Sequence, residues 1–336
     1  MDLRQLRYFQ AIVEQGSFSR ASELLNVAQP ALSLHVRNME AALGTALLFR
    51  SPQGVVATEA GQTLLRHARI IIDQFAIAEH DLKGRDVEPS GEVRLGLPGT
   101  ISQILSVPLI IEARRKFPKI KLRIAEAMSG FVMDWIREAR VDLAVLYTPV
   151  SDRVLASSSI LTEDLWLLGP VTQMQGVAAP ESGRCTYKRA ARLPLVLPSI
   201  DHGLRALLEK QASQHALSLN TVIEVDSYTN IKELVEVGMG YSILPFNSIA
   251  REVQDGRLRA WKIARPELKR AVHLVHPIDR PLTHAVERIE ALCRMTLLDL
   301  AATGRWQGAR ALKQQPASSA RAEKRPSGLR RRPIKR

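Results

Sequence analysis

Apolar residues near the start of the chain recur at steps of three and four, the spacing of an amphipathic helix. The first series ends near Gly16, and a second, shorter series stops at Asn26. Ser17 or Ser19 can cap the second helix, because a serine hydroxyl accepts hydrogen bonds from free backbone N–H groups at a helix start. The apolar positions of the two series are Leu3, Leu6, Phe9, Ile12, Val13, Ala21, Leu24 and Leu25.

A third helix is predicted to start at Pro30, where a missing N–H costs nothing, and to end at Gly44. Its buried stripe consists of Leu32, Val36, Met39 and Leu43. The opposite face carries Pro30, Leu34, Arg37 and Ala41, with Gln29 and Ser33 beside the first turn. A short helix that is braced by another and has polar residues at its N-terminal end is typical of a helix-turn-helix. The alternative is an ordinary helical hairpin in a globular core.

A long helix is predicted from Thr58, which can cap it, towards Gly84. Apolar residues separated by four and three form a heptad seam along it, and such a seam pairs two chains. The alternative is a helix that packs on its own domain. The seam consists of Leu64, Ala68, Ile71, Phe75, Ala78 and Leu82.

From Gly91 onward, segments that alternate like strands are interleaved with helical segments, and the same order recurs about a hundred residues later. This order is typical of parallel α/β sheets, and two such lobes place a ligand cleft between them. A strand, AVHLVHP, and a helix from Thr283 then return to the first lobe. We therefore predict a multidomain chain with a helix-turn-helix domain (1–58), a linker helix (59–86), a two-lobed α/β domain (91–303, with lobes 91–160 plus 268–303 and 161–267) and a tail (304–336).

Composition supports a folded, cytoplasmic protein. Hydrophobic residues make up 46% of 336 residues, and the two cysteines lie far apart, which argues against a disulfide scaffold. The first residues mix charged with apolar side chains, unlike a signal peptide, and no apolar run is long enough to span a membrane.

The net charge of +13 lies mostly in the tail. Residues 304–336 hold eleven Lys/Arg and one acid, a net charge of +10, whereas residues 1–65 hold five Arg and five acids. A segment so rich in Arg, Pro, Ser and Ala buries too little apolar surface to fold, so we expect it to be disordered. The overall basicity therefore says little about the folded body.

The N-terminal segment resembles the DNA-binding domain of the LysR-type transcriptional regulators. The similarity runs through LRYFQAIVEQGSFSRASELLNVAQPALSLHVRNMEAALGTALLFR and ATEAG. In that family QPALS opens the recognition helix, and residues 45–57 correspond to a wing, so the fold implied is a winged helix-turn-helix. The resemblance implies DNA contacts by Gln29, Pro30, Ser33, Leu34 and Arg37, and backbone contacts by Arg50, Ser51 and Gln53.

One position departs from the family pattern. A basic residue followed by Gln is common after ALS, but here Leu34 and His35 stand there. Our hypothesis is that Leu34 contacts a thymine methyl group, so that it reads a base by apolar contact. The alternative is a tolerated surface leucine.

The second half resembles the effector domain of the same family, through GEVRLGLPG, DLAVLY and VGMGYSILP. HGLR and the PGT turn resemble regulators of nitrogen assimilation. By position, the implied effector site consists of Thr100, Ile101, Ser102, Met128, Ser129, Ser199, His202 and Phe246. Hydroxyls beside a helix N-terminus favour an anion, although Thr100 and Ser102 can equally be helix caps. His202 can be a titratable donor or a solvated loop histidine.

No constellation for catalysis is found, and we expect neither a metal nor another cofactor. GMG at 238–240 precedes a strand, whereas a dinucleotide loop follows one. His273 and His276 point to opposite faces of a strand and are poor partners for one metal. Cys185 and Cys293 lack CxxC neighbours, and we expect buried thiols rather than a redox pair.

Three functions remain. The first is a DNA-binding regulator, dimeric or tetrameric, whose lobes bind a small molecule and which contacts RNA polymerase. The second is an intracellular small-molecule binding protein with a helical appendage, and the third is an α/β enzyme. The heptad linker speaks against the second, and the lack of a catalytic constellation against the third.

The basic tail leads to a prediction about salt. If its arginine clusters hold DNA non-specifically, deleting residues 304–336 should flatten the dependence of DNA affinity on salt concentration, because fewer counterions are released. Titrations over a salt series measure this slope. An unchanged slope would identify the tail as an inert extension.

Overall fold

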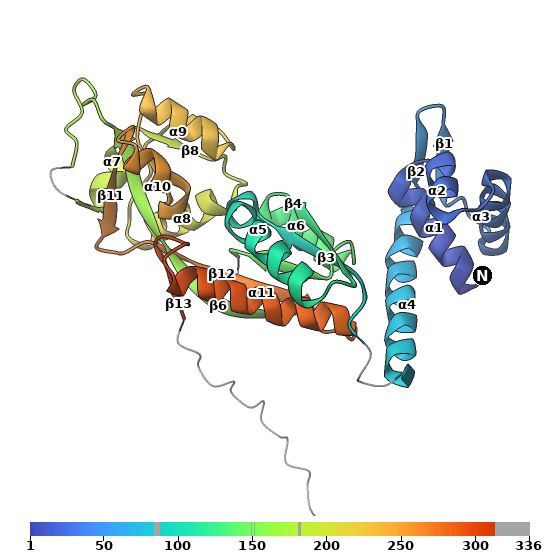
Figure 1. Cartoon of the computed structure of the whole chain (residues 1–336). Coiled ribbons are helices and arrows are strands. Elements are labelled where there is room, and N and C mark those ends of the chain that lie inside the picture. Colours follow the sequence, from blue (N-terminus) through green and yellow to red (C-terminus); the bar gives the residue numbers. More distant parts are fainter. Residues whose placement is uncertain (84–87, 149, 151, 181–182, 313–336) are drawn as a thin grey trace, which may run out of the picture.

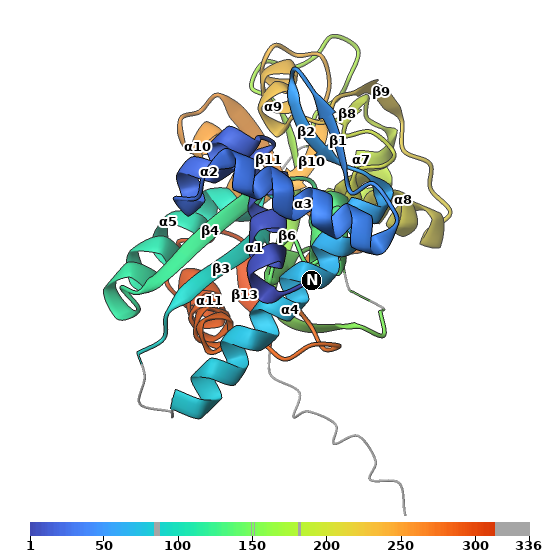
Figure 2. The same ribbon diagram turned by 90° about the vertical axis from the view of Figure 1, so that its right-hand side faces the viewer.

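The computed structural model describes residues 1–83, 88–148, 150, 152–180 and 183–312. Figure 1 shows the small N-terminal domain, the long helix α4 below it, and the two α/β lobes side by side. Figure 2, turned by 90°, looks onto α3 with the β1–β2 hairpin rising beside it.

Three helices and a hairpin form the N-terminal domain. Gly16, Asn26 and Gly44 end the three helices in the left-handed backbone conformation, as their residue types allow. Ser17 caps the second helix, with its hydroxyl accepting from the Arg20 N–H. The elements are α1 (Leu3–Gln15), α2 (Phe18–Leu25), α3 (Gln29–Leu43), β1 (Leu48–Ser51), β2 (Gly54–Ala57) and α4 (Glu59–Lys83).

The first turns of α4 belong to this domain's own core. Ala68 is fully buried (0% exposed) in the same apolar cluster as α1 and α3, and Leu64 packs against that cluster. Ala68 therefore cannot face a second chain, and the predicted pairing seam is wrong at that position. Farther along the helix, Ile71, Phe75 and Leu82 are exposed apolar residues.

The first lobe combines parallel and antiparallel strands. β3 pairs in parallel with β4 and β5, and β12 then joins antiparallel to β5 and β6. Its elements are β3 (Gly91–Leu97), α5 (Gly99–Lys116), β4 (Ile120–Glu126), α6 (Ser129–Arg137), β5 (Leu143–Leu146) and α11 (His284–Ala302), with parts of β6 (Leu155–Pro170) and β12 (Lys269–Pro277).

The second lobe is built on the far half of β6. β10 and β11 both pair antiparallel to it, and β11 pairs in parallel with β7. The elements are β7 (Arg184–Thr186), α7 (Tyr187–Arg192), β8 (Leu195–Leu197), α8 (Gly203–Gln214), β9 (Thr221–Glu224), α9 (Tyr228–Glu236), β10 (Ser242–Pro245), α10 (Phe246–Gln254) and β11 (Leu258–Ala264).

A 16-residue strand, β6, runs through both lobes beside β12. Leu161 belongs to the apolar core of the first lobe and Leu165 to that of the second, so the two cores meet within four residues of this strand. Parallel pairing, expected from the alternation of strands and helices, occurs between β3, β4 and β5 but not along β6 and β12. The sheet is mixed, because the chain crosses between the lobes along these two antiparallel strands.

The predicted disordered tail starts too early. Residues 304–312 are ordered: Trp306 is fully buried, and β13 (Ala309–Ala311) pairs antiparallel to β6. The rest of the predicted tail, 313–336, lies outside the described residues. A deletion that tests the salt dependence of DNA binding should therefore begin at residue 313, because an earlier cut removes a β-strand.

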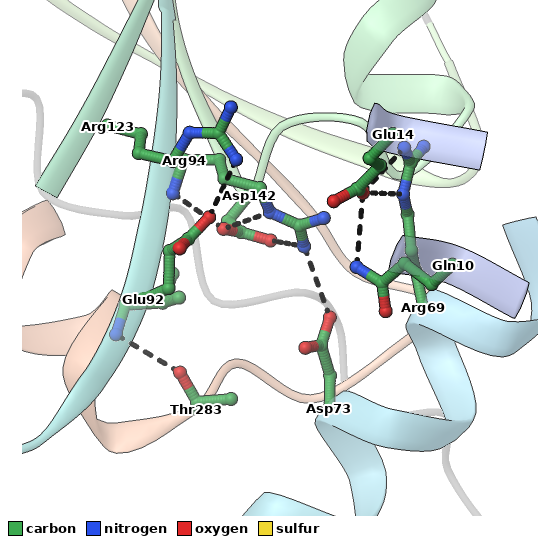
Figure 3. Close-up of polar contacts among 10 residues, drawn as sticks. Gln10, Glu14, Arg69, Asp73, Glu92, Arg94, Arg123, Asp142 and Thr283 are labelled. Carbon is green, nitrogen blue, oxygen red and sulfur yellow. Dashed lines mark hydrogen bonds and ion pairs between the residues drawn. The ribbon is translucent and has the colours of Figure 1, made fainter. Parts of the chain in front are cut away.

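A cluster of charged residues joins the N-terminal domain and α4 to the first lobe (Figure 3). Arg94 of β3 binds Asp142 through Nη2–Oδ1 (2.6 Å) and Nε–Oδ2 (3.1 Å), and its Nη2 lies 3.4 Å from Asp73 of α4. Arg69, also on α4, pairs with Glu14 of α1 at 3.0 Å. Glu14, Arg69, Asp73 and Arg94 are among the residues that line a cavity of about 670 Å³ between these elements.

Asp73 leads to a prediction about pH. Burial raises its pKa to about 6, although Arg94 opposes the shift. Because this carboxyl group titrates near 3.8 when exposed, the folded chain holds the proton more tightly. The contribution of Asp73 to stability therefore falls as the pH rises from about 4 to about 6. We expect Asp73→Asn to raise the thermal midpoint above that of wild type at pH 7.5, with a gain that shrinks by pH 5.

Thermal unfolding of both proteins between pH 5 and 7.5 measures this gain. Glu79→Gln, which alters an exposed carboxylate on the same helix, is the matched control and should show no such trend. A gain from Asp73→Asn that is constant across this range would contradict a raised pKa at Asp73.

Candidate DNA-reading head and effector site

The N-terminal turn of α3 is exposed and is held by α2. The Ser19 hydroxyl donates to Gln29 Oε1 at 3.1 Å, which leaves the Gln29 amide nitrogen free for other acceptors. Pro30 occupies the first turn, and behind it Leu32, Val36 and Met39 pack into the domain core. The predicted residues Gln29, Pro30, Leu34 and Arg37 are all exposed on this helix, and Ser33 is half-buried.

Arg50 of β1 connects the wing to α3. Its Nη2 lies 3.2 Å from Glu40 Oε2, its Nη1 donates to Ser33 Oγ at 3.4 Å, and its guanidinium lies 5.2 Å from the Phe18 ring centroid. Glu40 in turn accepts from the backbone N–H groups of Leu47 and Leu48. These contacts hold Arg50 beside the recognition helix, although part of its charge is already compensated by Glu40.

The tip of the wing carries Ser51 and Gln53, both exposed. Ser51 Oγ donates to the Gly54 carbonyl at 3.3 Å, which closes the turn. Beside this turn, the Val55 N–H donates a hydrogen bond of 2.9 Å to the Gly16 carbonyl at the end of α1. The wing is therefore anchored to the same helices that position α3.

Leu34 is 54% exposed, at the centre of the outward face of α3. The neighbouring His35 turns inward, with its ring 5.3 Å from that of Tyr8. The exposure of Leu34 agrees with both a thymine contact and a surface leucine, so both interpretations remain.

A buried polar cluster lies where the two lobes meet. Arg270 of β12 pairs with Glu163 of β6, and the guanidinium carbon lies 3.4 Å from the ring centroid of Tyr147. Thr100, at the start of α5, shares a hydrogen bond of 2.8 Å with the Tyr147 hydroxyl and accepts from Arg270 Nη2 at 3.5 Å. Tyr228, at the start of α9 in the other lobe, lies near enough to Arg270 for the two groups to influence each other's pKa.

The electrostatics of this cluster centre on Arg270. Burial opposes its charge, but Glu163 and the two tyrosines together raise its pKa above the usual value, so the guanidinium stays protonated. Burial raises the pKa of both Tyr147 and Tyr228, so both remain neutral hydroxyls. Burial and the charge of Arg270 lower the pKa of His202. The lobe junction thus holds one buried ion pair, Arg270 with Glu163, among neutral hydroxyl groups.

The other predicted effector residues have varied surroundings. Ser199 binds Asp226 through its hydroxyl and backbone N–H, and Phe246 packs on Trp166 with ring centroids 4.4 Å apart. His202 is an N-cap, with Nδ1 accepting from the Leu204 N–H at 3.1 Å, rather than a solvated loop residue. Ser102 bonds Ser106, and Met128 and Ser129 lie at the start of α6.

Ile101, also in the predicted effector set, has no accessible side chain in this structure. It is fully buried in the apolar core of the first lobe, because it faces the sheet from the first turn of α5. Sequence reasoning also missed Arg270, Glu163, Tyr147 and Tyr228. Charged residues within otherwise apolar strands, as in LTEDLWLL and KRAVHLV, were the available signal.

Among the described residues no group of His, Cys, Asp and Glu could hold a metal ion. Cys185 and Cys293 are buried in different lobes, and burial raises the pKa of the Cys293 thiol to about 12, so the two cannot form a redox pair within the chain. No helix in the described part of the chain is long and apolar enough to cross a membrane.

Comparisons with known proteins identify the family. The sequence model "Bacterial regulatory helix-turn-helix protein, lysR family" matches residues 3–62, and "LysR substrate binding domain" matches residues 87–297. The nitrogen assimilation regulatory protein nac of Escherichia coli is 30% identical over 295 residues, 87% of this chain and 94% of that protein. The protein of the same name from Klebsiella aerogenes is 31% identical over 277 residues, 82% and 88% respectively.

Solved structures share the fold. Full-length OxyR from Pseudomonas aeruginosa, a point variant, matches with a TM-score of 0.75 at 22% identity, covering 94% of this chain and 99% of that chain. Full-length CbnR in complex with its target DNA matches with a TM-score of 0.51 at 20% identity, covering 88% and 99%. Together with the exposed recognition helix and the two lobes, the sequence-model and sequence-relative matches show that the chain belongs to the LysR family and is a transcriptional regulator with a helix-turn-helix DNA-binding domain and an effector-binding domain.

Proposed function

We propose that this regulator binds a two-fold-related DNA site as a homo-oligomer, dimer or tetramer, in the cytoplasm. A small-molecule effector between the lobes would control its action on a promoter, with RNA polymerase as a further partner. The observation that carries the DNA part is the exposed N-terminal turn of α3, which presents Gln29 and Pro30 beside a wing anchored to the same domain. A helix presented in this way can enter the major groove end-on.

Base reading is proposed for the N-terminal half of α3. The free amide nitrogen of Gln29, with its oxygen held by Ser19, can donate to a base edge or a phosphate. Ser33 is near enough to Arg50 for both to contact one phosphate. Ser51, Gln53 and Arg37 would then lie along the DNA backbone, where they contribute affinity but little sequence preference.

Pairing of two chains is proposed along the outer part of α4. Ile71 and Phe75 are each nearly half exposed, and Leu82 is 88% exposed, so the helix presents an apolar stripe to solvent. Burying such a stripe against a second copy is favourable, and Ala78 would lie in the same contact. Two paired chains would present two recognition helices, which is why a two-fold-related site is expected.

The effector site is proposed at the lobe junction, around Thr100, Arg270 and Tyr228. These residues come from three different elements and from both lobes, so a ligand that contacts all of them would change how the lobes sit relative to each other. A ligand can shift this equilibrium only by its difference in affinity between the two arrangements.

Selection of bound sequences from random duplex DNA tests the DNA proposal. We expect an enriched motif with two-fold symmetry, weakened roughly tenfold or more by Gln29→Ala, because a good base contact contributes about 1–3 kcal/mol. Ser33→Ala should weaken binding too. Gln10→Ala, on the same domain but outside the proposed interface, is the control. Only salt-sensitive, sequence-independent binding would contradict the proposed reading head.

The same selected motif decides the role of Leu34. If Leu34 contacts a thymine methyl group, Leu34→Arg should lose discrimination at one base pair of the motif. If Leu34 is only a surface residue, the added cation should tighten binding equally at every sequence variant.

A further inference from the structure

The ordered residues after α11, here called the C-terminal strap (304–312), contact both lobes (Figure 1). The Asp164 N–H donates to the Gly308 carbonyl at 3.0 Å, next to the pairing of β13 with β6. The Gln307 N–H donates to Asn247 Oδ1 of α10 in the second lobe at 3.2 Å. The strap therefore lies across the place where the two cores meet.

One side chain of the strap reaches the buried cluster between the lobes. Trp306 is 0% exposed, and its indole Nε1 donates to Glu163 Oε2 at 2.8 Å. The other oxygen, Oε1, pairs with Arg270 Nε. Both oxygens of this buried carboxylate thus have a fixed partner, so the carboxylate cannot rotate without losing one of them.

The orientation of Glu163 determines which edge of Arg270 remains for other partners. With Nε held by Glu163, the Nη2 nitrogen is directed to Thr100, and Tyr228 approaches from the second lobe. The ring of Tyr147 covers one face of the guanidinium. The Nη edge is therefore the part of Arg270 that faces the lobe junction, and such an edge suits the planar recognition of a carboxylate.

We propose that Trp306 is a positioning residue for effector recognition and that the effector is a small organic monoanion whose carboxylate binds the Nη edge of Arg270. The proposal rests on the effector site proposed above. The indole holds Glu163, Glu163 holds Arg270, and Arg270 holds the anion. The sequence match to the family's substrate binding domain ends at residue 297. Trp306 lies beyond that segment and would nevertheless take part in effector recognition.

The preference for a single negative charge follows from the charge balance. Glu163 already compensates Arg270, so the cluster is neutral before a ligand arrives. His202 adds no compensating charge, because burial and Arg270 both lower its pKa. One extra negative charge among neutral hydroxyls is tolerable when it is hydrogen-bonded, whereas two are much harder to bury. A dicarboxylate should therefore bind less well than a monocarboxylate of similar size.

The test uses the full chain and four sodium salts, acetate, benzoate, succinate and citrate, with sodium chloride keeping the ionic strength equal. Thermal unfolding at increasing anion concentration yields an apparent Kd, because a ligand that binds the folded state raises the midpoint. We expect acetate or benzoate to raise the midpoint more than succinate and citrate do. Trp306→Phe, which keeps an aromatic ring but removes the N–H, should raise that Kd roughly tenfold.

Two comparisons separate positioning from mere packing. Trp261→Phe alters a buried tryptophan in the core of the second lobe and should leave the Kd unchanged even if it lowers the ligand-free midpoint. A Trp306→Phe variant that lowers the midpoint but keeps the wild-type Kd would overturn the proposal.

The absence of stabilisation by all four anions would also overturn it. The DNA selection separates this failure from that of the proposed function. A wild-type chain that selects a two-fold-related motif but ignores the anions refutes the monoanion site alone.

Discussion

The buried pair of Arg270 and Glu163 is the constraint on which the two-lobed structure depends. It lies on β12 and β6, the two strands that cross from one lobe to the other, next to the point where the cores divide. Two charges removed from water are tolerated only with close geometry and further hydrogen bonds. Thr100 of α5 and Trp306 of the C-terminal strap supply such bonds, and Tyr228 of α9 lies nearby. Elements that are distant in the sequence therefore meet at this buried pair.

A single strand connects this place with the DNA-binding half. β3 carries Arg94, which binds Asp142 and approaches Asp73 of the linker helix, and the chain reaches Thr100 three residues after β3 ends. Arg69 then ties the same helix to Glu14 in α1. The backbone of β3 and α4, together with the contacts of Arg94 and Arg69, thus connects the lobe junction with the domain that carries α3. Packed elements and polar contacts of this kind can carry coupling between two sites.

The helical half of this architecture was predictable from local signals. Apolar spacing and the residues Gly16, Asn26 and Gly44 located α1 to α3 well, because these ends depend on residues close in sequence. Ala68 shows the limit of such reasoning. Its place in the heptad pattern fits packing against a partner chain and packing against its own domain equally well. The folded structure shows that it packs against its own domain. The winged helix-turn-helix and the two lobes followed from resemblance as much as from periodicity.

The effector cluster was harder to predict because its members come from segments that are far apart in the sequence. Thr100 was identified from its place after a strand, but Arg270 and Glu163 became partners only through the long antiparallel pairing of β6 with β12. Trp306 lies in a segment whose composition resembles the basic tail that follows it. The indole of Trp306 is buried against a carboxylate to which it donates a hydrogen bond, and average composition does not detect such a contact.

A double-mutant cycle on the buried pair tests this account most directly. Chemical unfolding of wild type, Glu163→Gln, Arg270→Met and the double variant gives the four free energies. If the pair organises the lobe junction, each single change should cost about 3–5 kcal/mol, because it leaves a partner buried without compensation. The double change should then cost less than the sum by at least about 1 kcal/mol. Costs that add to within about 0.5 kcal/mol would contradict the central role assigned to this pair.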